Sequence, residues 1–203
     1  MKYLDDQVDK TRGIDYIFME YCNSGNIEEY VTKNKMEINE KFVWTFIMKI
    51  SRALAYLHSK DIIHSDIKPD AILCHRDDRK GLNVKLADFG SAYDGKMTKR
   101  QEYEAVFYRG NYNTAAPEII KNETFGKPAD IWAFGATVAF VCNKGYFLQK
   151  SNTGMQNPLK DGFEKYSGHL NLLVMSMMNP DPKRRPSAQK IWSKASWRLR
   201  RMK

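Results

Sequence analysis

The chain has 203 residues, of which 42% are hydrophobic and 28% charged, a composition typical of one soluble globular domain with a substantial core. The polar stretch 1–13 does not resemble a signal peptide, and the uncharged run 131–143 is too short to cross a bilayer, so we expect no membrane association. The formal net charge of +9 admits nucleic acid, an anionic surface or an acidic protein as a partner.

The first predicted elements are a strand, a short helix and a long helix. Residues 16–21 are aromatic and apolar and are followed by the polar residues 23–25, which indicates a strand that ends in a turn. Residues 26–33 indicate a short helix. From Glu40 to His58 the apolar residues recur at helical spacing, which predicts a long amphipathic helix.

The rest of the chain is predicted to be mostly helical. Two short β-type runs, 71–74 and 83–86, are separated by a polar turn. A polar stretch without clear periodicity then reaches Ala116, and such stretches are usually functional or mobile. Helices are expected at residues 117–122, 129–142, 169–178 and 187–194. The helix at 129–142 is apolar on all sides and therefore buried. We expect a mostly α fold with a few short strands.

The cysteines and the basic residues carry a weaker signal. Cys22, Cys74 and Cys142 are odd in number and widely spaced, which favours a reducing compartment, the cytoplasm or the nucleus. Residues 198–203 form a basic tail. Because the other lysines and arginines are scattered and do not alternate with aromatic residues, we interpret the positive charge as a solvated face. Nucleic-acid binding is kept as a minor alternative.

Two segments contain residues suited to phosphoryl chemistry. Asp66, directly after the long helix, is placed to accept a proton from an incoming hydroxyl, and Lys68 to neutralise charge on a transferring phosphoryl group. Asp88 ends a strand ahead of Phe89 and Gly90. An aspartate in this position can direct both oxygens toward a metal ion that bridges phosphates. Each pattern by itself is more often an ordinary surface turn.

A second pair of residues is interpreted as structural. Glu118 stands at the start of a predicted helix, and Arg185 precedes Pro186 near the end of the chain. A carboxylate and a guanidinium so placed form a plausible buried ion pair. Such a pair anchors a long loop and carries no chemistry.

Taken together, the order and spacing of these segments resemble the eukaryotic protein kinase family, serine/threonine type. Residues 64–71 are similar to the catalytic loop H-R-D-L-x-x-x-N, residues 88–90 match D-F-G, and residues 116–118 match A-P-E. Residues 130–135 resemble the start of the family's central helix, and residues 181–186 resemble its closing D-P-x-x-R-P. Residues 16–22 resemble the last strand of the small lobe with the hinge. The resemblance covers residues 15–197.

The resemblance implies a role for each matched residue. Asp66 would be the catalytic base, Lys68 the phosphate-side cation and Asp88 the ligand of Mg²⁺. The adenine of ATP would meet backbone groups of Glu20 and Cys22 above an apolar floor at Leu73. The structural roles would fall to His64 stacked on Phe89, Asp130 below the catalytic loop, and Glu118 paired with Arg185.

The sequence also departs from the family pattern. Ala71 replaces the asparagine that binds a second Mg²⁺, so we expect binding of ATP and Mg²⁺ to be weak or absent, and Ser65 replaces the arginine of H-R-D. No G-x-G-x-x-G and no lysine in a V-A-I-K setting occurs. We therefore expect a kinase-like carboxyl-terminal lobe at residues 23–197, with the amino-terminal lobe largely absent. Residues 1–22 would be a remnant of its strands and hinge.

Two functions stay open at this point. The chain is either a serine/threonine kinase that is inactive as this chain alone, or a pseudokinase that acts as a binding or regulatory module on another kinase. Asp66, Lys68 and Asp88 favour the first interpretation, and Ala71 and Ser65 favour the second. The surface that faces the amino-terminal lobe would then bind a protein partner, another kinase or a second copy of the chain.

Overall fold

Two helices at the centre of the molecule organise the fold of this computed structural model, which describes residues 2–33, 38–79, 81–98, 102–104, 108, 110–146 and 166–202. Helix α5 (Lys127–Cys142) is buried at every position from Ala129 to Cys142. A helix that is apolar all round must lie inside the core. The prediction of a buried central helix is confirmed.

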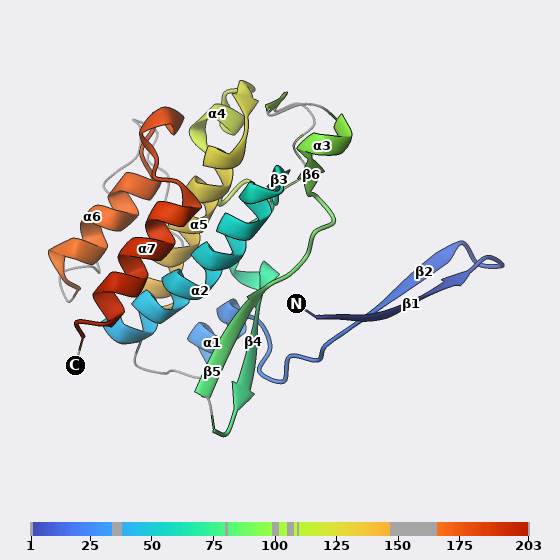
Figure 1. Cartoon of the computed structure of the whole chain (residues 1–203), viewed down its shortest axis with the longest axis horizontal. Helices are drawn as coiled ribbons and strands as arrows, with labels where there is room; N and C mark the ends of the chain where they lie inside the picture. Colours follow the sequence, from blue (N-terminus) through green and yellow to red (C-terminus); the bar gives the residue numbers. More distant parts are fainter. Residues whose placement is uncertain are drawn as a thin grey trace.

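Helix α2 (Glu40–Ser59) covers one side of α5 with its apolar face, which includes Val43, Ile47, Ile50 and Leu54. The helix begins where the side chain of Asn39 accepts a hydrogen bond from the backbone N–H of Phe42 at 2.9 Å. Helix α7 (Ala188–Leu199) lies along α2, and α6 (Gly168–Met177) packs against α5 (Figure 1). These helices confirm the predicted helical elements.

The described residues also contain short strand pairs and single turns of helix. The strand pairs are β3 (Ile62–Ile63) with β6 (Tyr93–Asp94), β4 (Ile72–Asp77) with β5 (Gly81–Leu86), and β7 (Tyr103–Glu104) with β8 (Thr124–Phe125). The shorter helices are α1 (Ile27–Lys33), α3 (Gly95–Thr98), α4 (Pro117–Ile120) and the 3-10 turns Pro69–Ala71 and Pro182–Arg184. Part of the polar stretch that ends at Ala116 lies outside the described residues. No described helix is long and apolar enough to span a bilayer.

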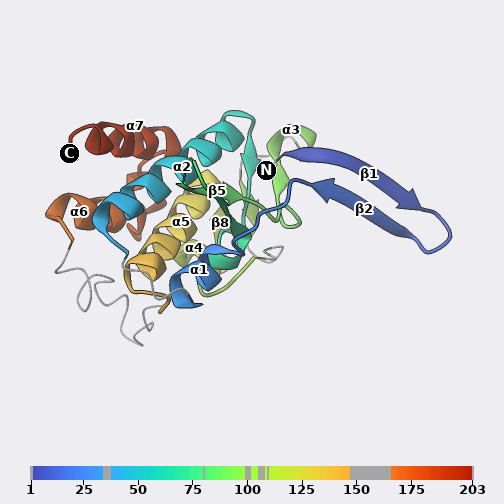
Figure 2. The same ribbon diagram turned by 90° about the horizontal axis from the view of Figure 1, so that it is seen from below.

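The amino-terminal end differs from the prediction. Strand β1 (Tyr3–Asp9) pairs antiparallel with β2 (Ile14–Met19), and the hairpin projects from the helical body in both views (Figures 1 and 2). The turn is closed by Asp9, whose Oδ1 accepts from the backbone N–H of Thr11 at 2.9 Å, and by Gly13 at φ 65.

The expected fold class is wrong on this point. The sequence predicts little of an amino-terminal lobe, with residues 1–22 as a remnant of its strands and hinge. The partner strand instead runs over seven residues. It escaped prediction because both faces of the ribbon are exposed, so its polar residues show no alternation with apolar ones.

Candidate active site

The carboxylate of Asp66, in the loop between β3 and β4, accepts a hydrogen bond at each of its two oxygens. The residue is buried, and its Oδ2 accepts a hydrogen bond from Nζ of Lys68 at 2.7 Å. Its Oδ1 accepts from the backbone N–H of Asn111, also at 2.7 Å. Charge-assisted bonds of this length hold a carboxylate in one orientation. Asp66 is therefore positioned as a proton acceptor.

Asn111 contributes to this site through its backbone. Its backbone N–H, and not its side chain, makes the bond to Asp66. The Asn111 side chain instead accepts from the backbone N–H of Asn113 at 2.8 Å, which closes a local turn. A backbone donor does not depend on residue type, so no sequence signal could have revealed it.

Lys68 lies between three carboxylates. Its Nζ is 2.7 Å from Asp66, 3.8 Å from Asp88 and 4.0 Å from Asp70. The hydrogen bond to Asp66, with the nearby negative charges, raises the pKa of Lys68 although partial burial opposes this. The ammonium group therefore stays protonated at neutral pH, next to the proton acceptor.

Asp130, from the first turn of α5, holds the catalytic loop from below. Its Oδ2 accepts from the backbone N–H of His64 at 2.9 Å, and its Oδ1 from that of Ser65 at 2.8 Å. Nε2 of His58 lies 2.8 Å from Oδ2. The side chain of Asp130 is fully buried. Sequence reasoning did not identify His58, because a histidine at a helix end has no distinguishing pattern.

Ser65 replaces the arginine of the family pattern and makes a hydrogen bond between two neutral groups instead. Its backbone lies in the left-handed region at φ 58, which costs a non-glycine residue about 1 kcal/mol or more. Its hydroxyl donates to the backbone oxygen of Ser91, just after the D-F-G segment. The bond joins the catalytic loop to the following segment without supplying positive charge.

His64 and Phe89 are in ring contact, with centroids 4.9 Å apart. Nε2 of His64 lies 2.9 Å from the backbone oxygen of Ala87, which fixes the imidazole. Phe89 remains 45% exposed, so its outer face is open to solvent. Such an exposed ring is a surface that another group can cover.

The residues present fit a magnesium site with one protein carboxylate. Asp88 has a left-handed backbone, φ 61, and its side chain is 53% exposed. Ala71 is buried and offers no oxygen, and no cluster of three or more candidate metal ligands occurs among the described residues. Mg²⁺ commonly takes one or two carboxylates and completes its shell with phosphates and water. Asp88 would be its ligand in this chain.

The segment after β2 lies along β4. The backbone N–H of Ser24 donates to the oxygen of Cys74 at 3.1 Å, and Asn26 forms a bridge with Leu73. Cys22 and Leu73 are both half-buried here. The carboxylate of Glu20 pairs with Lys85, and this bond lowers the pKa of Glu20. Glu20 and Leu73 therefore both lie at the β4–β5 pair, and Cys22 belongs to the segment between Glu20 and the contacts with β4.

Glu118 and Arg185 lie apart from Asp66 and form a bidentate ion pair. The two guanidinium nitrogens donate to the two carboxylate oxygens at 2.6 and 2.7 Å. Arg185 also lies 5.0 Å from the ring centroid of Trp132. The pair connects α4 to the 3-10 turn at Pro182–Arg184 and contributes to the scaffold.

Comparison with known proteins decides the family. The family model for the protein kinase domain matches residues 7–197. This chain belongs to the protein kinase family. The match begins within β1, so the kinase domain includes the amino-terminal strand pair. The expectation of a carboxyl-terminal lobe alone is overturned by this match.

Curated kinases are similar to most of the chain. A probable serine/threonine-protein kinase nek2 from Dictyostelium discoideum is 29% identical over 94% of this chain. Serine/threonine-protein kinase 33 from Bos taurus is 28% identical over 92%. A membrane-associated tyrosine- and threonine-specific cdc2-inhibitory kinase from Drosophila melanogaster is 33% identical over 88%. The chain spans 47%, 40% and 32% of the lengths of these kinases, respectively.

Proposed function

We propose that the site around Asp66 serves phosphoryl transfer from ATP to a serine or threonine hydroxyl of a protein. The observation that carries this proposal is the grip on Asp66, held at one oxygen by Lys68 and at the other by the backbone of Asn111. Asp66 accepts the hydroxyl proton as the substrate oxygen bonds to the γ-phosphorus and the bond to ADP breaks. Lys68 neutralises charge on the transferring group. Mg²⁺ at Asp88 would supply further neutralisation.

We further propose that these 203 residues by themselves transfer phosphate too slowly to detect. The sequence contains no G-x-G-x-x-G, no lysine in a V-A-I-K setting, and Ala71 at the second metal position. Each lost preorganised contact costs about 2.7–4 kcal/mol, so three losses remove about 8–12 kcal/mol if they add. Such a loss lowers the rate by more than about a millionfold.

Transfer of labelled phosphate from ATP to a generic basic protein tests both statements. The unmodified chain is expected to give no signal above the Asp66→Asn variant. A signal that Asp66→Asn abolishes would show that the chain alone is an active kinase. Mg²⁺-dependent ATP binding, measured by calorimetry, is expected to be weaker than micromolar and to be lost in Asp88→Asn. Binding that is equal with and without Asp88 would refute the assigned magnesium site.

A second candidate function is a binding or regulatory module on another kinase. Ser65 favours it, because its hydroxyl is engaged with the backbone of Ser91 and supplies no cation for a phosphorylated segment. Expression of the Asp66→Asn variant in cells that lack the unmodified protein, with rescue of their phenotype as the readout, separates the two functions. A module retains its effect in Asp66→Asn, whereas a catalytic function loses it.

We also propose a cytoplasmic or nuclear location. None of the residues Cys22, Cys74 and Cys142 takes part in a disulfide, which suits a reducing compartment. Fractionation of cells that express the chain with a small epitope tag tests this. Recovery in a secreted or vesicular fraction would contradict it.

A further inference from the structure

The β1–β2 hairpin exposes apolar side chains that a monomer rarely leaves uncovered. Phe18, Ile17, Tyr16 and Met19 are 47%, 64%, 42% and 49% exposed, respectively. A ribbon of two strands is marginally stable in water without a covering surface. The hairpin therefore requires a contact that the described part of the chain does not supply.

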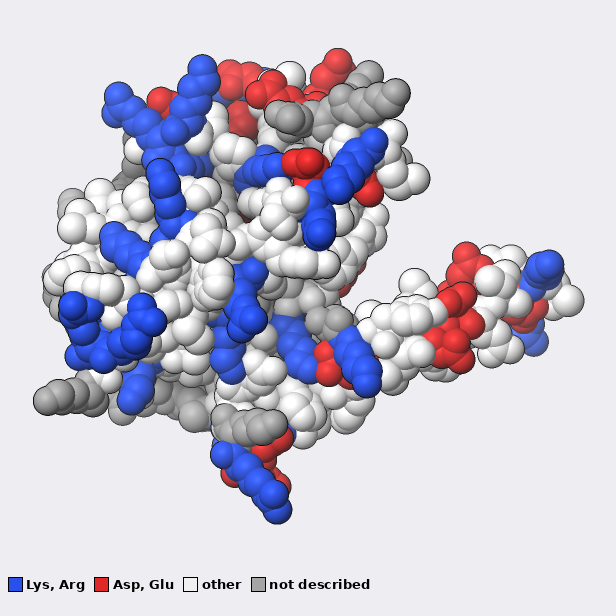
Figure 3. All heavy atoms as spheres, in the orientation of Figure 1, with Lys and Arg blue, Asp and Glu red and all other residues white. Residues whose placement is uncertain are grey.

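One face of the hairpin combines an apolar row with an acidic row, in which Asp5 and Asp9 are carboxylates and Gln7 between them is neutral. The register pairs Phe18 with Asp5, Tyr16 with Gln7 and Ile14 with Asp9, and paired residues share a face. Figure 3 shows the acidic side chains grouped along this ribbon, in a chain whose net charge is +9. We call this side, with its three pairs, the aromatic face.

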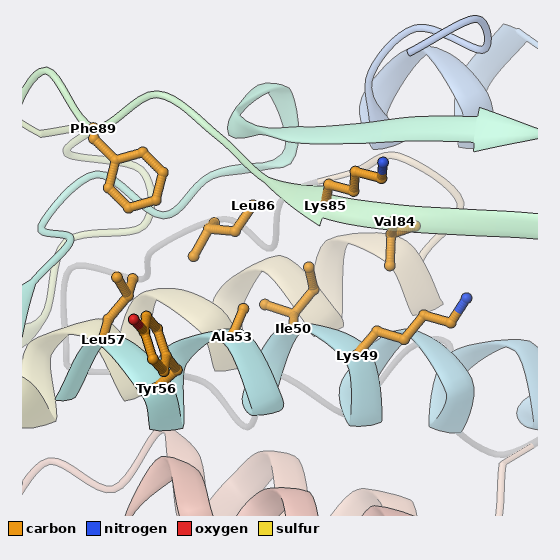
Figure 4. Close-up of a pocket in the computed structure, with 9 residues that line it drawn as sticks. All are labelled: Lys49, Ile50, Ala53, Tyr56, Leu57, Val84, Lys85, Leu86 and Phe89. Atoms are coloured by element: carbon orange, nitrogen blue, oxygen red, sulfur yellow. The ribbon is translucent and has the colours of Figure 1, made fainter. Parts of the chain in front are cut away.

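A groove in the helical body has the complementary character. It lies between α2 and β5, has a volume of about 310 Å³ and includes no acidic residue in its lining. Its walls are apolar, with Phe89 at one end and two lysines toward the other (Figure 4). The lining residues are Lys49, Ile50, Ala53, Tyr56, Leu57, Val84, Lys85, Leu86 and Phe89.

Lys49 is a cation that a carboxylate would complement. Its Nζ donates to the backbone oxygen of Leu82 at 3.2 Å and to Oδ1 of Asn83 at 2.8 Å. No carboxylate pairs with it in the described part of the chain. Partial burial lowers the pKa of Lys49, which means that its charged form is incompletely solvated.

The root of the hairpin lies at the edge of this groove. Lys85, which lines the groove, pairs with Glu20, the residue that follows β2. A two-fold arrangement would let the hairpin of each molecule reach the groove of the other. We propose that the α2–β5 groove of each copy binds the aromatic face of the hairpin from a second copy, forming a reciprocal dimer.

Sedimentation equilibrium of the full chain, from about 1 to about 100 µM, tests the dimer. The unmodified chain is expected to dimerise in this range. Phe18→Glu buries a charge in the groove and should weaken the dimer about 30-fold or more. Ile17→Glu is the matched control, since it changes the opposite face of the same strand, and it should change the affinity by less than about threefold.

A second pair of variants tests the groove independently of hairpin folding. Lys49→Glu should weaken the dimer about tenfold or more, because the new carboxylate would repel the acidic row on the hairpin of the second copy. Lys41→Glu makes the same charge change on α2 outside the groove lining and should have little effect. Helical circular dichroism should be unchanged in all four variants, and the melting temperature should be unchanged in Phe18→Glu, Ile17→Glu and Lys41→Glu.

The proposal is overturned by either of two results. The first is a chain that stays monomeric to about 100 µM. This result overturns the proposal even if hydrogen exchange shows that the hairpin amides are protected, because the hairpin would then cover the groove of its own chain. The second is a dimer that responds equally to Phe18→Glu and Ile17→Glu, or equally to Lys49→Glu and Lys41→Glu. Neither readout depends on phosphoryl transfer.

Discussion

Arg185 donates to both carboxylate oxygens of Glu118, at 2.6 and 2.7 Å, across 67 positions of sequence. The Arg185 side chain is 0% exposed and that of Glu118 is 4% exposed. Nε of Arg185 also donates to the backbone oxygen of Asn179 at 2.8 Å. A buried charge held in this way depends on every one of its partners.

Truncation of this pair should be strongly destabilising. Glu118→Ala leaves the Arg185 charge buried without its partner and should reduce the free energy of unfolding by about 3–5 kcal/mol. Glu29→Ala is the matched control, since it breaks an exposed pair in which Lys33 lies 3.3 Å away. It should cost less than about 1 kcal/mol. Urea unfolding measures both, and equal losses would contradict the structural role of the buried pair.

Asp130 should control the order of the catalytic loop. Asp130→Asn replaces one acceptor oxygen with an amide group and removes the charge, so it weakens the bonds to the backbone of His64 and Ser65. Hydrogen exchange at these two amides should accelerate about 10- to 100-fold. Asp61→Asn is the control, because its carboxylate pairs with Lys127 at 2.6 Å outside this loop. Unchanged protection in Asp130→Asn would exclude the tether.

Glu40 should make part of the stability depend on pH. Burial raises its pKa, but hydrogen bonds from Ser167 and Trp44 outweigh burial and lower it below the ordinary value of 4.5. Because the folded pKa is lowered, the stabilisation is present above the unfolded pKa and disappears as pH falls through the folded pKa.

Glu40→Gln should therefore reduce the free energy of unfolding by about 1–3 kcal/mol at pH 7. The difference from the unmodified chain should shrink as pH falls below the ordinary carboxyl range, about 4.3, and through the lowered folded pKa of Glu40. Glu123→Gln changes an exposed carboxylate and should have no effect at either pH. A difference for Glu40→Gln that is the same at both pH values would disprove the linkage.

The thiols of Cys74 and Cys22 should differ in reactivity. Burial raises the pKa of Cys74 to about 12, and the thiolate is the reactive form. Cys22 is only half-buried. At pH 8, iodoacetamide should label Cys22 first, with Cys74 labelled only on unfolding. Peptide mapping reports the sites, and rapid labelling of Cys74 in the native chain would contradict its burial.

The sequence by itself determined the family resemblance and the central helix. The kinase motifs are local strings of residues, so their order along the chain carries the information without any contact between them. The helix at residues 129–142 is apolar on every side, and only the interior of a protein accepts such a helix. For the same reason the amphipathic pattern of α2 was readable from its spacing.

Only the tertiary structure decided which groups hold the site and where the chain begins its first strand. The bond from the Asn111 backbone to Asp66 and the contact of His58 with Asp130 join residues 45 and 72 positions apart. Such contacts depend on how helices and loops pack, and a backbone donor has no signature in residue type. Strand β1 was missed because a ribbon exposed on both faces has no buried side to impose an alternating pattern on its residues.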